Sequence, residues 1–300
     1  MVQPIPYILE FEFTYGAATR ISPNVRRLVT NNPGPFTGWG TNVYLIGQDQ
    51  LVIIDPGPNT DPHFDVLCEA IGPANLVGIF VTHHHKDHSP MARRLATQYR
   101  CKTYGFGPPE CPQNPTDVAL EAGEDMQFEP DIRLRDGEVF SKGNWQIECV
   151  HTPGHTSNHM CYRVLPDNGL VCGDHVLAWS TSVVIPPDGR MSDYLQSLQK
   201  VQSLQPAHLW PGHGPAIDDP KPFLSAYLAH RALRDTEILA QLQSGHKRIK
   251  QMVPEMYANI DSRLYPAASV SVFSHLIRLI EIGQVVCEAE PTIDALYRLA

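Results

Sequence analysis

Three features that would place a chain outside the ordinary globular class are missing from this sequence. No apolar run approaches the roughly 18 residues that a membrane-spanning helix requires. Residues 1–6 lack the basic segment and the following apolar segment of a secretory signal, so we expect no such signal here. The seven cysteines are odd in number and contain no C-x-x-C pair, which is typical of reduced cysteines in a cytosolic protein. We therefore expect a cytoplasmic protein without a membrane partner.

Positive charge is also scarce. The chain has 23 Lys and Arg against 32 Asp and Glu, a formal net charge of −9. Because a nonspecific grip on nucleic acid comes from Lys and Arg, this balance disfavours a protein whose main task is that grip, although it leaves room for a local basic patch. With 42% hydrophobic residues in 300, the chain can bury the core of one large domain, or of a main domain with an appendage.

Histidine and aspartate, in contrast, recur in a dense pattern. Residues 82–88 read Thr-His-His-His-Lys-Asp-His, and three later turns read Pro-Gly-His155, Cys-Gly-Asp174 and Pro-Gly-His213. Imidazole nitrogens and carboxylate oxygens suit zinc, iron or manganese. Each group follows a predicted strand, where loop backbone is free to converge on a point. Seven side chains are thus predicted metal ligands: His83, His85, Asp87, His88, His155, Asp174 and His213.

The first two thirds of the chain predict interleaved strands and helices. Residues 42–46 and 51–54 flank a short turn and predict a hairpin. Residues 77–81 form a continuous apolar run, typical of a strand buried on both faces, and lead into the histidine-rich segment. Ser89 and Pro90 then predict the start of a helix, with Ser89 as its N-cap.

From residue 132 to residue 176 the pattern is that of antiparallel strands. The strands are expected around residues 145–150, 159–164 and 169–172, followed by a helix at 192–204 and a short strand at 207–210. Such interleaving favours an α/β fold in which helices cover both faces of packed sheets. The Pro- and Asp-rich residues 107–130 are the least regular part, and we expect a substrate-shaping loop there.

The sequence pattern changes after Pro220-Lys221-Pro222, from interleaved strands and helices to mainly helices. Helices are expected at residues 223–242, 249–257 and 267–282, with a short strand at 283–286. This order predicts a winged-helix appendage, with a plain helical cap as the alternative. Between residues 223 and 300, eight Lys and Arg balance eight Asp and Glu, so the appendage has no basic excess. We predict a catalytic domain of residues 1–220 and a C-terminal domain of residues 221–300.

Spacing divides the predicted ligands into two sets. His83 and His85, two apart in an extended segment, point to one side and can share a metal. Asp87 and His88 belong to the following turn and can reach a second metal nearby. The first set is then His83, His85 and His155, the second is Asp87, His88 and His213, and Asp174 is the carboxylate placed to bridge both.

Two metals about 3.5–4 Å apart can hold a bridging water, lower its pKa and stabilise the oxyanion that follows its attack. No serine or cysteine nucleophile is then needed, because a metal-bridging hydroxide is the nucleophile. We predict Asp87 and Asp174 as the catalytic residues, with the leaving group departing on the side of Asp87 and His88. The expected cofactors are two divalent ions, zinc first, with iron and manganese as alternatives.

Three neighbouring residues have other predicted roles. Ser157 has no positioned base and is interpreted as a turn residue. His84, between two ligands, should face the opposite way and pack or support the site. Asp55, which ends a strand before Pro-Gly, either accepts an N–H from a ligand or caps its turn.

The order and rough spacing of His83-x-His85-x-Asp87-His88, His155, Asp174 and His213 resemble the metallo-β-lactamase superfamily over about residues 35–220. The resemblance implies the four-layer αββα sandwich, an α/β (α+β) fold, with a binuclear site at one edge. Asp174 stands where true zinc β-lactamases have cysteine. This position is similar to the glyoxalase II and nuclease type, which argues against antibiotic hydrolysis.

Three further segments resemble the branch of this superfamily that carries a C-terminal winged helix. They are residues 33–42, residues 152–160 and the run Tyr227-Leu228-Ala229-His230-Arg231 with Arg234. That branch includes the β-lactamase-like endoribonuclease and the standalone thioesterases of polyketide pathways.

Three functional hypotheses follow. The first is a hydrolase of an ester-like bond in a small molecule: a thioester, a lactone or a carboxylic ester. The second is a metal-dependent phosphodiesterase that cleaves single-stranded RNA guided by the winged helix, which the acidic balance disfavours. The third is a non-catalytic binding module with structural metals, which a closed site without an open coordination position would favour. Nothing in the sequence determines the oligomeric state.

Overall fold

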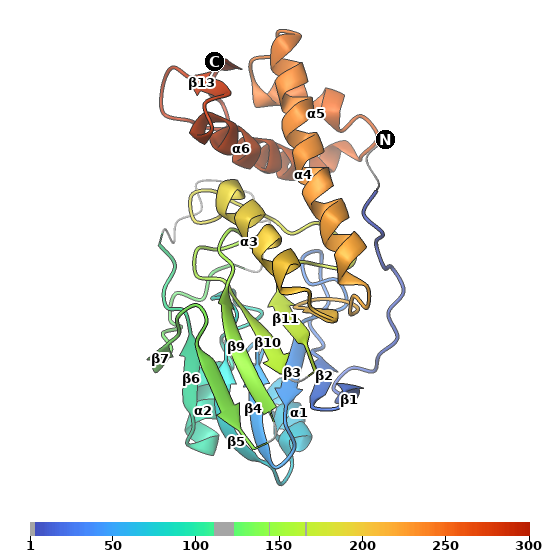
Figure 1. The fold of residues 1–300 in the computed structure, drawn as a ribbon, viewed down its shortest axis with the longest axis vertical. Helices are drawn as coiled ribbons and strands as arrows, with labels where there is room; N and C mark the ends of the chain where they lie inside the picture. The colour runs from blue at the N-terminus through green and yellow to red at the C-terminus, as the bar shows by residue number, and fades with distance from the viewer. Residues whose placement is uncertain (1–3, 111–122, 144, 166) are drawn as a thin grey trace.

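The computed structural model describes residues 4–110, 123–143, 145–165 and 167–300. The strands of its two large sheets are β1 (Thr19–Ser22), β2 (Val25–Val29), β3 (Asn42–Ile46), β4 (Gln50–Ile54), β5 (Asn75–Phe80), β6 (Lys102–Gly105), β7 (Ile132–Arg133), β8 (Val139–Lys142), β9 (Trp145–His151), β10 (Met160–Leu165), β11 (Gly169–Gly173) and β12 (His208–Pro211). The helices are α1 (Asp61–Ile71), α2 (Ala92–Tyr99), α3 (Met191–Leu204), α4 (Pro220–Gln243), α5 (Ile249–Met256) and α6 (Tyr265–Glu281), with a 3-10 turn η1 (Ser262–Leu264) before α6. Strand β13 (Val285–Cys287) pairs antiparallel with β14 (Tyr297–Leu299) in a small two-stranded sheet (Figure 1).

The strand order of the sheets brings several strand ends together. The seven-stranded sheet has the order β1-β2-β3-β4-β5-β6-β7 and the five-stranded sheet the order β12-β11-β10-β9-β8. Strands β4 to β7 are parallel to one another, and so are β11 and β12. The carboxyl ends of parallel neighbours lie at one edge of a sheet, which is where ligands bind in open α/β sheets. The loops that follow β4, β5, β11 and β12 are therefore placed to meet.

The two large sheets pack face to face, and helices cover their outer faces. In β3, Tyr44 and Ile46 belong to the core between the sheets, whereas Val43 and Leu45 belong to the core under α1 and α2. Successive side chains of a strand alternate between its faces, so a strand covered on both sides is apolar throughout. The predicted αββα layers are thereby confirmed.

Helix α4 contributes to two separate cores. Its first part, with Phe223 and Tyr227, packs with Tyr194 of α3 over the five-stranded sheet. Its later residues Ile238 and Leu242 join a second core with α5, α6 and β13. Figure 1 shows α5 and α6 beyond α3, on the side away from the sheets. The predicted division between residues 1–220 and 221–300 stays a prediction, because one helix serves both cores.

Two predictions about local structure are wrong. Ser89 does not cap a helix, since α2 begins at Ala92 and the Ser89 hydroxyl donates to Asp125 Oδ2 at 2.8 Å. The loop that begins with the histidine-rich segment extends through residues 89–91, so the helix starts later than predicted. Within residues 132–176, which the sequence predicts to be antiparallel, β7 is instead parallel to β6, whereas β8, β9, β10 and β11 pair antiparallel as expected.

Several other elements have no counterpart in the predictions, among them β1, β2 and α1. The buried face of α1 consists of His63, Leu67 and Ile71, so its first apolar position holds a histidine. The ring of His63 lies 2.7 Å from the carbonyl of Pro56 and is thereby satisfied in the interior. Of the expected substrate-shaping loop, residues 111–122 lie outside the described part of the chain. Among the helices described, none is long and apolar enough to cross a membrane.

Candidate metal centre

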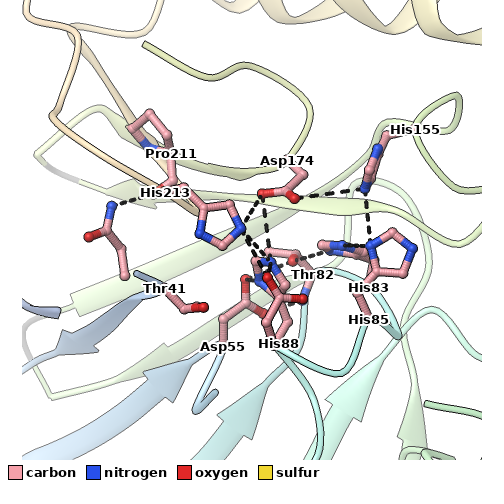
Figure 2. Close-up of polar contacts among 12 residues, drawn as sticks. Thr41, Asp55, Thr82, His83, His85, His88, His155, Asp174, Pro211 and His213 are labelled. Atoms are coloured by element: carbon pink, nitrogen blue, oxygen red, sulfur yellow. Dashed lines mark hydrogen bonds and ion pairs between the residues drawn. The ribbon is translucent and has the colours of Figure 1, made fainter. Parts of the chain in front are cut away.

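The predicted ligands come from loops at the carboxyl ends of strands. Asp55 follows β4, the segment from Thr82 to His88 follows β5, and His155 follows β9. Asp174 directly follows β11, and His213 lies two residues beyond β12. Figure 2 shows Asp174 between His213 on one side and His155 on the other, with the β5 loop facing all three. The convergence expected from the strand order is therefore present.

His83, His85, His155 and Asp174 form a first group, whose donor atoms all lie within 4.8 Å of one another. Nε2 of His83 is 2.9 Å from Nδ1 of His85, and that atom is 3.3 Å from Nε2 of His155. Oδ2 of Asp174 lies 3.9 Å from Nε2 of His155. This spacing is tight enough for one ion to be contacted by all four side chains.

Asp87, His88 and His213 form a second group within the same limit. Nε2 of His213 is 3.1 Å from Oδ2 of Asp87 and 3.3 Å from Nε2 of His88. Oδ1 of Asp174 lies 3.4 Å from Nε2 of His213. Asp174 thus turns one oxygen toward each group, as a bridging carboxylate would, and its assignment as the bridge stays a prediction.

Backbone carbonyls orient two of the imidazoles. Nδ1 of His155 lies 2.8 Å from the carbonyl oxygen of Val183, and Nδ1 of His213 lies 3.2 Å from that of Gly40. A carbonyl only accepts hydrogen bonds, so in both rings Nδ1 carries the proton. The lone pair of a neutral ring is then on Nε2, which faces the centre.

Asp55 orients two more. Its Oδ2 lies 2.9 Å from Nδ1 of His88 and also accepts the hydroxyl proton of Thr82 at 2.7 Å. Because the Thr82 hydroxyl gives its proton to Asp55, it must accept at its other contact, 2.9 Å from Nδ1 of His83. Asp55 therefore directs the Nε2 lone pairs of both His83 and His88 toward the centre. Of its two predicted roles, the contact with the N–H of a predicted ligand is the one observed.

The charges of the second group call for a cation. Burial would lower the pKa of His213, but the carboxylates of Asp174 and Asp87 raise that pKa to about 10. Burial would likewise raise the pKa of Asp87, but His88 and His213 lower it to about 2. The two carboxylates thus stabilise positive charge beside these buried rings. A divalent ion could supply that charge in place of protons.

The donor set fits such ions. Oδ1 of Asp174 is buried without a hydrogen-bond partner among the described residues, although it faces two imidazoles. Imidazole lone pairs that face one another cannot pair with one another, and a metal would satisfy them together. The described His and Asp groups are therefore able to bind metal, without selecting zinc over iron.

Glycine is required at position 212, where the backbone passes close to this centre. A Cβ at Gly212 would lie 2.5 Å from Oδ1 of Asp174 and 2.8 Å from Cε1 of His88. Such contacts are shorter than van der Waals packing permits, so the Pro-Gly-His213 turn needs glycine at this position. The sequence pattern contained this signal. The carbonyls of Gly40 and Val183 carried none, because every residue has a carbonyl.

Two residues near the ligands lie outside the centre. Nδ1 of His84 is 3.1 Å from Oδ1 of Asn158, so this ring faces away from the donor groups as expected. The hydroxyl of Ser157 donates to Oδ1 of Asp188 at 2.5 Å, and the Ser157 N–H donates to Oδ2 at 2.9 Å. The structure thus places a carboxylate beside the Ser157 hydroxyl that the sequence did not indicate, whereas the backbone of Ser157 lies in a turn, in agreement with its interpretation.

The centre opens into a pocket of about 80 Å³. Its described walls are His85, Asp87, His155 and Asp174 together with Pro35, Phe36, Leu177, Trp179, Ser180, Thr181 and Val183. Since both donor groups contribute to this wall, a molecule in the pocket could reach both. Such access is what a catalytic metal site has and a closed structural site lacks.

The four-layer fold and this histidine–aspartate centre define a metal-dependent hydrolase of the αββα class. Residues 36–213 match the model of the metallo-beta-lactamase superfamily, which covers more than half of the chain. The chain belongs to that superfamily. Residues 249–292 match the beta-lactamase associated winged helix domain, which confirms the predicted winged-helix appendage.

Curated relatives match over most of their length. The chain is 30% identical over 286 residues to the beta-lactamase-like protein 2 homolog of Drosophila melanogaster, covering 89% of this chain and 91% of that protein. It is 28% identical over 291 residues to the atrochrysone carboxyl ACP thioesterase dmxR1 of Cryptosporiopsis sp. (strain 8999), covering 90% and 83%.

Solved structures support the same fold. A beta-lactamase domain protein from Burkholderia ambifaria superposes with a TM-score of 0.80 at 22% identity, covering 97% of this chain and 96% of that one. A metallo-beta-lactamase family protein from Thermus thermophilus superposes with a TM-score of 0.74 at 20% identity, covering 94% and 100%. At these identities the likeness concerns the fold alone.

Proposed function

We propose that this protein is a binuclear metal-dependent hydrolase of an ester-like bond in a small molecule, namely a thioester, a lactone or a carboxylic ester. The proposal rests on the orientation of Asp174. One of its carboxylate oxygens faces each of the two donor groups, at the wall of an open pocket. In this proposal His83, His85 and His155 hold one ion, and Asp87, His88 and His213 hold the other. Asp174 holds both.

Two bound divalent ions would supply a water of lowered pKa and positive charge for the oxyanion that forms at the carbonyl. The protein's own residues prepare that environment. Asp55 and Thr82 hold the His83 and His88 rings so that Nε2 of each points inward. The apolar Trp179 side chain lines the pocket beside the centre and limits its access to bulk water.

An uncharged reacting group suits the described walls of the pocket. They contain no Lys or Arg beside the metal ligands, and Pro35, Phe36, Leu177 and Val183 make them largely apolar. A phosphodiester carries a negative charge, and proteins that bind RNA contact its phosphates with Lys and Arg. The pocket therefore favours a carbonyl ester over the phosphodiester of RNA. The relative named as a thioesterase supports the same substrate class.

We propose zinc as the resident metal, with iron and manganese as alternatives. Three of the four donors of the first group are imidazoles, and each group includes a carboxylate or shares one. This mixture suits zinc, and the same ligands accept the other two metals. Metal analysis of the protein as purified, without added ions, tests the choice.

The experiment that tests the reaction offers several substrates to the purified protein with defined zinc, iron or manganese. These are acyl-thioesters, lactones, carboxylic esters and a fluorescent single-stranded RNA. Asp87→Ala should abolish hydrolysis of at least one ester class, because it removes a carboxylate of the second group. Asp218→Ala is the matched control, since that carboxylate is largely exposed and pairs with His208.

Each outcome is decisive. RNA cleavage that is lost in Asp87→Ala, without ester hydrolysis, would replace this proposal by the phosphodiesterase. Absence of turnover with every metal and every substrate would favour a non-catalytic binding module.

A further inference from the structure

The run His230-Arg231 with Arg234 belongs to neither donor group of the metal centre. These residues lie in the middle of α4, where the helix passes from the sandwich to the C-terminal helices (Figure 1). There they line a cavity of about 450 Å³. Its opposite walls come from residues 179–184, which follow β11, and from α6 and the residues just before it. A cavity of this size accommodates a drug-sized molecule.

This cavity adjoins the pocket at the metal centre. Five residues line both: Pro35, Trp179, Ser180, Thr181 and Val183. The pocket at the centre is too small for more than the reacting group, at about 80 Å³. A larger substrate with its carbonyl at the centre therefore has this cavity beside it for one of its arms.

The charge of the described cavity wall is positive. It contains Arg231 and Arg234 and neither Asp nor Glu, although acidic residues outnumber basic ones in the chain. Arg234 donates to Glu237 at 2.6 Å, and its side chain keeps 19% of its surface exposed. Its guanidinium lies 4.6 Å over the ring of Tyr257, which also lines the cavity.

Arg231 is the more deeply buried of the two, and its guanidinium lies 5.1 Å over the ring of Tyr194. It is 3% exposed, and no carboxylate oxygen lies within 4.0 Å of it among the described residues. One of its nitrogens donates to the Ser182 carbonyl at 2.6 Å, whereas its buried Nε has no partner in the described part of the chain. A buried charge without a counter-charge is costly. An anion in the cavity would offset that cost.

The rest of the wall suits an apolar body. Tyr257, Ile260, Leu264, Ala267, Ala268 and Val270 contribute it from the C-terminal helices and the segments between them. Aliphatic and aromatic walls with two charged groups are typical of a small-molecule site in which the charges determine orientation.

We propose that this cavity receives one arm of the substrate, an apolar body ending in a carboxylate or a phosphate, and that Arg231 and Arg234 contact that anion. The proposal rests on the proposed function, in which an ester-like bond is hydrolysed at the metal centre. It assigns part of substrate selection to the C-terminal helices.

The kinetic test compares thioesters that differ in the presence and the position of a negative charge. N-acetylcysteamine thioesters of dicarboxylic acids from succinic to suberic acid place the anion on the acyl arm, and those of the matching monocarboxylic acids are neutral. Hexanoyl-coenzyme A places phosphates on the leaving arm instead. The arm whose charge raises kcat/KM identifies the source of the anion.

The metal-loaded variants then assign the residues. Arg234→Gln should lower the ratio of kcat/KM for the anionic over the neutral thioester by about tenfold. That factor corresponds to the loss of one hydrogen bond to a charged group. Arg234→Lys should restore part of that ratio, because lysine keeps the charge but lacks the planar fork. Arg298→Gln, an exposed cation on β14, is the control that leaves the ratio unchanged.

A binding test separates this proposal from the proposed function. Naphthalene-2-sulfonate and the neutral 2-naphthamide are titrated into the metal-free protein. The sulfonate should bind about tenfold more tightly, and Arg234→Gln should remove that preference. If no thioester is hydrolysed but this preference is present, the reaction is wrong and the anion site stands. Equal affinities, with equal ratios in the wild type, Arg234→Gln and a folded Arg231→Met variant, overturn the anion site even if hydrolysis proceeds.

Discussion

The carboxylate of Asp55 lies 2.9 Å from Nδ1 of His88, and both side chains are almost completely buried. Through the hydroxyl of Thr82 the same carboxylate also reaches His83, which belongs to the other donor group. One aspartate outside both donor groups thus orients a ring in each. Outer partners of this kind affect metal affinity because they fix the direction of the ligand's lone pair.

Replacing Asp55 by asparagine should therefore lower the affinity of the protein for both metal ions by about 10- to 100-fold. The amide presents one acceptor where the carboxylate accepts from His88 and Thr82 with Oδ2 and from the Thr82 N–H with Oδ1. Competition with a chelator measures the two affinities. Thr82→Val, which interrupts only the path to His83, should weaken one metal and spare the other. Equal weakening of both metals in Thr82→Val would contradict the separate paths.

Asp174→Ala should lose both ions, because it removes the ligand proposed to be common to them. His155→Ala removes a donor of one group only and should leave the other ion bound. Metal content after dialysis, determined by mass spectrometry, reads both variants directly. Full retention of two ions in Asp174→Ala would disprove the bridging assignment.

Tyr227 connects α4 to the loop beside the metal centre. Its hydroxyl lies 2.6 Å from the carbonyl of Leu177 and 2.5 Å from that of Ser180. The same loop continues to Val183, whose carbonyl orients His155. Tyr227→Phe removes the one O–H that the two carbonyls share and the oxygen that accepts the Leu177 N–H, which should lower the free energy of unfolding by about 1–3 kcal/mol.

Urea unfolding of the metal-free protein measures that loss, with Tyr15→Phe as the control because Tyr15 is 40% exposed. If the loop also positions His155, Tyr227→Phe should reduce the affinity of the first metal. An unchanged affinity together with the stability loss would limit Tyr227 to a structural role.

The residues of the two donor groups were predictable because their signal is local. The His83-x-His85-x-Asp87-His88 spacing and the glycine turns before His155 and His213 stand in the sequence beside the strands that deliver them. Asp55 could be found for the same reason, at the end of its strand. The αββα layers followed from the apolar runs and from the resemblance that these motifs carried.

Contacts between distant segments could not be predicted. Arg231 meets the carbonyl of Ser182 across 49 positions, and the carbonyl of Gly40 orients His213 across 173. Carbonyl acceptors have no residue type, so no pattern marks them. The start of α2 was misplaced for a related reason, since Ser89 hydrogen-bonds to Asp125 from a separate segment instead of capping the helix.

His230 should make the protein less stable in mild acid. Burial, and then the charges of Arg231 and Arg234, lower the pKa of this partly buried ring from 6.5 to about 4. Between pH 6.5 and pH 4 the ring is therefore protonated in the unfolded chain but neutral in the folded chain. The free energy of unfolding falls as the pH drops through this range. Replacing His230 by glutamine should remove about 1–2 kcal/mol of the loss in unfolding free energy between pH 7 and pH 5, less than the whole shift because the ring is only partly buried. Urea unfolding of the metal-free proteins at both values measures it, with His208→Gln on the surface as the control. An identical loss in His230→Gln and the wild type would show that the ring takes up its proton equally in both states.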